Sequence, residues 1–138
     1  MKYVLVILLL FIAGCNGAVN DDDQNNQAPT SVADLSNPER LSVYYFYGDG
    51  CPICAQQAPF MDNLEQDYDV DVIRLEIYYN RVNQQLFREV ADIYETSVGG
   101  VPTTFIGERA WVGFSDRAAA QIEAYIAGCL EEGCEEKI

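Results

Sequence analysis

The stretch LSVYYFYGDGCPIC, residues 41–54, decides the fold of this 138-residue chain. Its first seven residues are mostly β-branched and aromatic, which predicts a buried strand over 41–47. The Gly-Asp-Gly that follows predicts a tight turn. Pro52 is tolerated in the first turn of a helix, because its missing N–H has no intrahelical partner there. We therefore predict a strand, a turn and a helix over 52–68 that begins at two cysteines.

Cys51 and Cys54 form a C-x-x-C pair at the start of this helix. The unpaired N–H groups and the positive dipole end of a helix favour the thiolate form of the first cysteine. A thiolate with a second thiol two residues away is the minimum needed for disulfide exchange. The same spacing also supplies half of a zinc site. The chain contains no histidine, which weighs against zinc or copper, so we favour redox chemistry and keep a metal-binding module as the alternative.

The N-terminus predicts export. An uncharged apolar run over residues 3–13 follows Lys2. It is shorter than the ~20 residues that span a bilayer and has the length of a secretory signal. The run ends in IAGC, residues 12–15, which resembles the lipobox of bacterial lipoproteins, where the chain is cut before a cysteine that carries a diacylglycerol. We predict a signal peptide over 1–14 and a lipid on Cys15. An ordinary cleaved signal and an uncleaved short anchor are the alternatives.

The predicted mature chain consists of a tether and one domain. Residues 15–36 are mostly polar and predict a flexible tether, and residues 37–138 predict a single folded domain in the cell envelope, outside the cytoplasm. The 22 acidic residues against 8 basic ones give a net charge of −14, which disfavours nucleic acid and anionic lipid as direct partners. Cationic or unfolded proteins remain possible partners, and the charge can also serve only to keep the domain soluble.

A second cysteine pair lies near the C-terminus. Cys129 and Cys134 enclose Gly133, which can end a helix in the left-handed conformation. Exported proteins can form disulfides, so we predict a structural disulfide at the end of the last helix. A second redox relay is one alternative. The other is a zinc site in which this pair joins Cys51 and Cys54.

The rest of the chain predicts an α/β fold of order β-α-β-α-β-β-α. Alternating and helical periodicities indicate a strand over 69–79, a helix over 83–94, a hairpin over 103–114 and a helix over 116–130. We expect Ile53 on the apolar face of the first helix and Ile93 on that of the second. The right-handed crossover rule makes the first two strands parallel, and the hairpin adds antiparallel strands. The prediction is a central mixed sheet flanked by helices.

Over about residues 41–130 the chain resembles the thioredoxin superfamily, which includes thioredoxins and glutaredoxins. The C-x-x-C follows the first core strand, and Pro59 stands where thioredoxins have a helix proline. Pro102 precedes the hairpin, where the family has a cis-proline. The run VPTTFIG, residues 101–107, is similar to a glutaredoxin segment. The resemblance implies a thioredoxin-like fold.

The resemblance also implies an activity, that of a thiol-disulfide oxidoreductase without a cofactor. Cys51 would be the exposed nucleophile and Cys54 the buried resolving thiol. Pro102 would lie beside them, and the main chain of Val101 would bind an extended protein substrate. An ordinary trans turn is the alternative for Pro102. A recharging partner at the membrane and a monomeric state are the corresponding expectations.

Three departures from the family pattern limit what the resemblance implies. Gly50 replaces the Trp that precedes the first cysteine of thioredoxins. Tyr45 replaces their buried acid, which removes the usual proton acceptor. The dipeptide Pro-Ile between the cysteines matches none of the familiar subfamilies, and no basic residue stands near the pair in sequence, so a glutathione-dependent role is not supported. The direction of exchange stays open.

Overall fold

The computed structural model describes residues 29–35, 39–97 and 99–138. The predicted signal peptide and Cys15 lie outside these residues. The elements in chain order are the 3-10 helix η1 (Val32–Asp34), β1 (Leu41–Tyr47), α1 (Pro52–Asp67), β2 (Val70–Glu76), α2 (Arg81–Ile93), β3 (Thr103–Ile106), β4 (Arg109–Val112) and α3 (Asp116–Glu132). The predicted order of strands and helices is confirmed.

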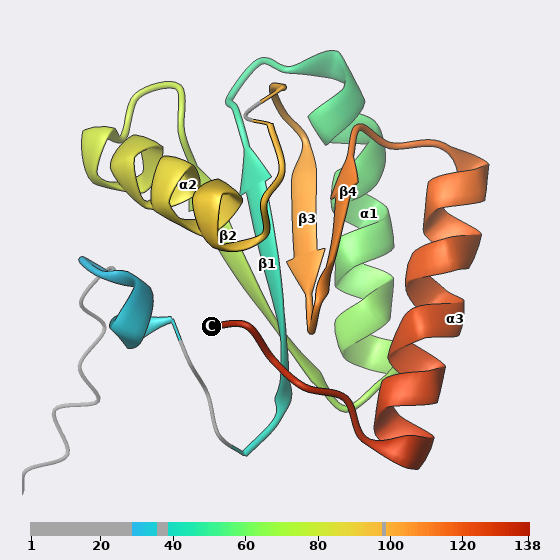
Figure 1. Cartoon of the computed structure of the whole chain (residues 1–138). Coiled ribbons are helices and arrows are strands. Elements are labelled where there is room, and N and C mark those ends of the chain that lie inside the picture. Colours follow the sequence, from blue (N-terminus) through green and yellow to red (C-terminus); the bar gives the residue numbers. More distant parts are fainter. Residues whose placement is uncertain (1–28, 36–38, 98) are drawn as a thin grey trace, which may run out of the picture.

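The four strands form one mixed sheet in the order β2-β1-β3-β4. β1 and β2 are parallel, whereas β3 is antiparallel to both β1 and β4. Helix α2 covers one face of the sheet, and α1 and α3 cover the other (Figure 1). This is the predicted central mixed sheet flanked by helices.

Strand β1 contributes side chains to both cores, because successive side chains of a strand point to opposite faces. Tyr44 and Phe46 pack with the buried side of α2, and Val43 and Tyr45 pack with α1 and α3. Burial on both faces explains why the strand is an almost continuous apolar run.

Two predicted core residues lie elsewhere. Ile53 and Ile93 were expected on the apolar faces of α1 and α2, but each side chain is 40% exposed. Both residues are close to a helix end, Ile53 in the first turn of α1 and Ile93 at the last residue of α2.

Local hydrogen bonds move the predicted element boundaries. Strand β2 ends at Glu76, because its carboxylate accepts hydrogen bonds from the backbone N–H groups that follow. Helix α2 begins at Arg81, two residues earlier than predicted, because the side chain of Asn80 accepts from Val82 N and Asn83 N. Such N-cap bonds satisfy otherwise unpaired donors of the first turn.

Both ends of the described chain pack onto the domain. Leu35, which we assigned to the tether, is buried, and Tyr44 donates its hydroxyl hydrogen to the Leu35 carbonyl at 3.2 Å. The folded unit therefore begins before residue 37. After α3 the C-terminal segment runs back across the sheet (Figure 1), where Ser42 N donates to the Glu136 carboxylate at 3.0 Å. In the part of the chain that the structure describes, no helix combines the length and apolarity needed to cross a membrane.

Candidate active site

The turn between β1 and α1 places Cys51 at the N-cap of α1. Gly50 has a φ of +81°, a left-handed conformation that favours glycine, and Cys51 N donates to the Gly48 carbonyl at 3.1 Å. The Cys51 Sγ accepts a hydrogen bond from Cys54 N at 3.1 Å. A sulfur at this position receives the N–H bond and the positive dipole end that favour a thiolate when the pair is reduced.

Cys51 and Cys54 are joined by a disulfide whose Cα atoms are 5.2 Å apart. Cys51 is 8% exposed and Cys54 is 3% exposed. Cys51 is thus the more accessible of the two, although it is less exposed than the resemblance implied. The reason is that its sulfur lies between the first turn of α1 and the Val101 carbonyl, 3.9 Å away.

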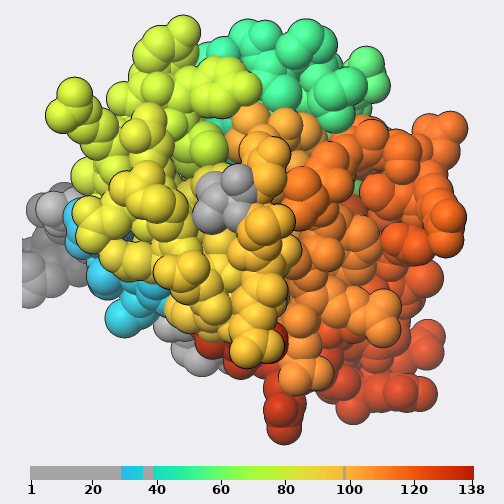
Figure 2. Space-filling model, turned by 45° about the horizontal axis from the view of Figure 1, so that its top comes forward, coloured from blue at the N-terminus to red at the C-terminus, as the bar shows by residue number. Residues whose placement is uncertain are grey.

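The segment before β3 lies beside this disulfide. The Val101–Pro102 peptide bond is cis, so the alternative of an ordinary trans turn does not apply. Gly113 N donates to the Pro102 carbonyl at 2.8 Å, and the Thr103 hydroxyl donates to the Gly100 carbonyl at 2.7 Å. The segment leading into β3, the start of α1 and the segment after β2 meet on one face of the molecule (Figure 2).

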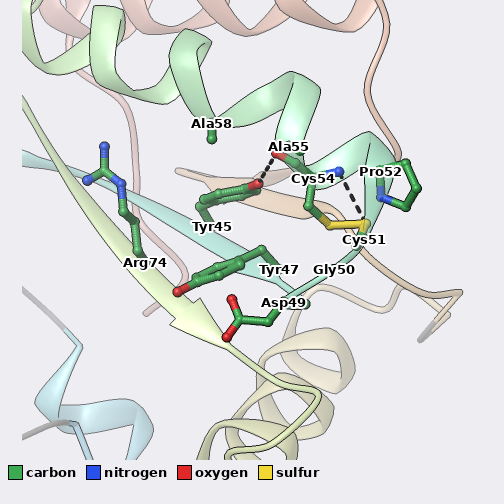
Figure 3. Close-up of a pocket in the computed structure, with 11 residues that line it drawn as sticks. Tyr45, Tyr47, Asp49, Gly50, Cys51, Pro52, Cys54, Ala55, Ala58 and Arg74 are labelled. Carbon is green, nitrogen blue, oxygen red and sulfur yellow. Dashed lines mark hydrogen bonds between the residues drawn. A yellow bond between two sulfur atoms is a disulfide. The ribbon is translucent and has the colours of Figure 1, made fainter.

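A pocket of about 430 Å³ adjoins the disulfide on the side of β2 (Figure 3). Both cysteines line it, together with Tyr45 and Tyr47 from β1 and Arg74 from β2. Arg74 is distant from the pair in sequence but lines the same pocket, because the β1–β2 register places it opposite Tyr45. Its guanidinium is held by carboxylates of α1.

Comparison of the fold with solved structures identifies its class. The chain matches no protein-family model and no curated protein. It is similar to a structure described as the thiol:disulfide interchange protein DsbE from Chlorobium tepidum, with a TM-score of 0.52 and 18% identity over 66% of this chain and 80% of that one. It is also similar to a mutant thioredoxin from Halobacterium salinarum, with a TM-score of 0.50 and 25% identity over 72% of this chain and 87% of that one. The chain has the thioredoxin fold.

On this thioredoxin fold, Tyr45 extends from β1 to the first turn of α1. Its hydroxyl donates to the Cys54 carbonyl at 2.9 Å, and the side chain is buried. Burial raises the pKa of Tyr45 to about 12. Tyr45 is therefore a neutral hydrogen-bond donor at neutral pH, and it fixes the first turn of α1 instead of accepting a proton from a thiol.

Glu76, at the end of β2, supports the turn that carries Cys51, and we did not predict this role. Its Oε1 accepts hydrogen bonds from Asp49 N at 3.3 Å and Tyr78 N at 2.6 Å. Its Oε2 accepts from Tyr79 N at 3.0 Å and Asn80 N at 3.1 Å. One carboxylate thus ties the β1–α1 turn of the thioredoxin fold to the β2–α2 loop. No sequence signal identifies it, because all four partners are backbone groups.

Glu76 gives the fold a predicted dependence on pH. Burial alone would raise the pKa of Glu76, but the four backbone hydrogen bonds together lower it. A carboxyl group whose pKa is lower in the folded state than its ordinary value of 4.5 stabilises the fold at pH values above 4.5. This stabilisation is lost as the pH falls through the folded-state pKa. We expect the free energy of unfolding of the wild type, measured by urea denaturation, to fall more steeply between pH 6 and pH 3 than that of Glu76→Gln.

Glu131→Gln, at the exposed end of α3, is the matched control for this measurement. It should leave the pH dependence of the wild type unchanged, because Glu131 makes none of the four bonds that hold the active-site turn. Equal slopes for wild type and Glu76→Gln would show that the carboxylate bonds do not stabilise the fold.

The second cysteine pair lies at the other end of β3. Cys129 and Cys134 are joined by a disulfide with Cα atoms 4.8 Å apart, at the point where α3 ends in Gly133. A Cβ on Gly107, just after β3, would lie 3.2 Å from the Cys134 Sγ, whereas Cys51 lies next to Val101, just before β3.

This separation bears on whether the two cysteine pairs can act together. The four residues of β3 span about 13 Å, so the two pairs neither form a four-cysteine site nor contact each other for direct exchange. Within residues 29–35, 39–97 and 99–138, no group of three or more His, Cys, Asp or Glu side chains is placed to hold a metal ion.

Proposed function

We propose that the chain is an exported, membrane-tethered thiol-disulfide oxidoreductase that exchanges disulfides with protein cysteines. The thioredoxin fold and the disulfide in C-x-x-C spacing support a thiol-disulfide oxidoreductase. The observation that carries the proposal is the position of the Cys51–Cys54 disulfide, at the N-terminus of α1 and beside the Val101 carbonyl. This position combines a thiolate-stabilising helix end with main-chain groups that can hold a substrate segment.

In the reducing direction, the Cys51 thiolate attacks one sulfur of a substrate disulfide. The substrate S–S bond breaks, a mixed disulfide forms, and the first substrate sulfur leaves as a thiolate that takes a proton from solvent. Cys54 then gives its proton to solvent and attacks the Cys51 sulfur, which breaks the mixed disulfide and releases the second substrate sulfur as a thiolate that takes a proton from solvent. The substrate gains two electrons and two protons, and the enzyme pair becomes the observed disulfide. The oxidising direction runs the same steps in reverse.

During either direction the main chain of Val101 would hold the substrate. A substrate segment lying along the Val101–Pro102 peptide would place its cysteine beside the Cys51 sulfur, because the Val101 carbonyl is 3.9 Å from that sulfur. A thiol redox partner at the membrane would then recharge Cys51 and Cys54. No cofactor takes part in this scheme.

The remaining features belong to the same proposal. A lipid on Cys15, after removal of residues 1–14, would hold a monomeric domain outside the cytoplasm and close to its recharging partner. The Cys129–Cys134 disulfide would be structural, because it closes the turn from which the C-terminal segment returns to the sheet.

Insulin reduction, combined with metal analysis, tests the proposed function. The purified protein is expected to accelerate the dithiothreitol-dependent reduction of insulin and to contain zinc and copper far below one equivalent. Stoichiometric metal without exchange activity would overturn the proposal in favour of a metal-binding module. Thiol trapping in cells would then give the direction, since an oxidase is held mainly oxidised and a reductase or isomerase mainly reduced.

A further inference from the structure

We propose that the pocket beside the Cys51–Cys54 disulfide selects substrates by binding a lysine or arginine side chain close to the target cysteine. This inference rests on the proposed function and specifies its substrate class. The pocket volume of about 430 Å³ lies within the ~300–1,000 Å³ of typical ligand sites. Both cysteines are among the residues that line the pocket, so a side chain bound in it lies beside the C-x-x-C pair.

The walls of the pocket are mainly apolar. The rings of Tyr45 and Tyr47 stack with centroids 5.4 Å apart on one face of β1. Opposite them, Ala55 and Ala58 on the solvent side of α1 also line the pocket (Figure 3). The alanines are too small to fill the space between α1 and β2, and this keeps the pocket open. Such walls suit the methylene stem of a long basic side chain, and the partly exposed ring of Tyr47 suits its cationic head.

The charges around the pocket favour a cation. Asp49 is exposed at the rim beside Tyr47, and the carboxylate of Glu76 lies close to it because it accepts the Asp49 N–H. Burial, and then the negative charges of Asp49 and Glu76, raise the pKa of Tyr47, whereas the positive charge of Arg74 lowers it; the net direction is upward, so the carboxylates outweigh the guanidinium at this wall.

The one cation that lines the pocket is already neutralised. Arg74 Nη2 is 2.7 Å from the Asp62 carboxylate and 2.8 Å from that of Glu65. Two anions therefore face one guanidinium, and the surroundings of the pocket are net negative, as is the whole chain. An acidic substrate side chain would be repelled by the carboxylates of Asp49 and Glu76. An aliphatic side chain would form no ion pair with Asp49.

The position of the pocket fits the direction in which a substrate would bind. Val101 approaches the disulfide from the side of β3, whereas the pocket lies on the side of β2, and β1 separates the two strands in the sheet. A substrate whose main chain lies on Val101 therefore has its cysteine at Cys51 and can extend a neighbouring side chain across the disulfide into the pocket.

The test compares peptide disulfides that differ at one residue next to the cysteine: lysine, arginine, norleucine or glutamate. With the full chain, we expect kcat/KM for the lysine and arginine peptides to exceed that of the norleucine peptide about three- to tenfold at low salt, and to exceed that of the glutamate peptide by more. Added salt should reduce this preference, because the Asp49 carboxylate is exposed.

The ratio of kcat/KM for the lysine and norleucine peptides is the readout, because it does not depend on the amount of active protein. Ala58→Leu fills the pocket from the exposed side of α1 and should bring the ratio close to one. Asp49→Asn should lower the ratio and weaken its salt dependence. Ala120→Leu, which adds the same side chain on an exposed position of α3, is the matched control and should keep the wild-type ratio.

The outcomes separate this inference from the proposed function. Failure of the wild type to turn over any peptide would overturn the proposed function. Turnover of all peptides with a wild-type ratio near one, or a preference for norleucine or glutamate, would overturn the inference alone. A wild-type preference that survives in Ala58→Leu would overturn the assignment of the basic side chain to this pocket.

Discussion

Replacing Cys51 with serine is expected to abolish disulfide exchange, lowering its rate at least about a thousandfold. The proposed reaction needs a thiolate at the N-cap of α1, and a serine hydroxyl is neither ionised at neutral pH nor able to form a disulfide. Because Cys51 and Cys54 act together in the proposed reaction, loss of the nucleophile alone removes most of the catalysis. Insulin reduction and peptide exchange both measure the effect.

Cys54→Ser supplies the complementary result. With Cys51 intact and no resolving thiol, we expect a mixed disulfide with the substrate to accumulate, visible as a higher-mass band that dithiothreitol removes. The double variant Cys129→Ala/Cys134→Ala is the control and should keep exchange activity below its melting temperature, because that pair lies at the other end of β3. Activity that survives in Cys51→Ser but is lost in the double variant would move the reactive site to the second pair.

Phe105→Ala is expected to lower the free energy of unfolding by about 3–5 kcal/mol. The Phe105 ring is completely buried in β3, and its centroid lies 4.7 Å from that of Tyr94 and 5.7 Å from that of Phe46. Its removal leaves a cavity between the sheet and α2 that these neighbours fill only in part. Because small domains are stable by roughly 5–15 kcal/mol, this one substitution removes a large share of the total.

Val112→Ala, on the neighbouring strand β4, is the control for this measurement. Its side chain is exposed, and exposed substitutions away from special features usually change stability by less than about 0.5 kcal/mol. Urea denaturation of both variants gives the comparison. A loss below 1 kcal/mol for Phe105→Ala would mean that the aromatic cluster on the α2 face is not the main core.

The sequence was sufficient to predict the order of strands and helices, because their apolar periodicities are strong and their ends carry turn residues. It also predicted the mixed sheet, since crossover handedness leaves one arrangement for the first two strands. It failed for Ile53, because an apolar residue in the first turn of a helix does not reveal whether any element covers it. The predicted boundary of the tether, at residue 36, left out Leu35. This residue packs against a core formed by residues far along the chain, which no local pattern reveals.

The site was harder to predict than the fold. The C-x-x-C pair and the proline before β3 are visible in sequence because they depend on residue type and spacing. Glu76 binds four backbone N–H groups, and no pattern of side chains signals such bonds. Arg74 reaches the pocket only through the register that pairs it with Tyr45, a residue 29 positions earlier. Contacts set by register become visible only in the folded chain.

The C-terminal segment has a further consequence for the part of β1 that no other strand covers. Strand β3 pairs with β1 only from Val43 to Phe46, so the first two residues of β1 extend beyond it. The Glu136 carboxylate accepts a hydrogen bond from Ser42 N, which lies outside the part of β1 that pairs with β3. Unpaired N–H groups along a strand are templates on which another chain can add a strand. The last residues thus close an open length of sheet edge with a negative charge, which discourages the growth of intermolecular β-structure.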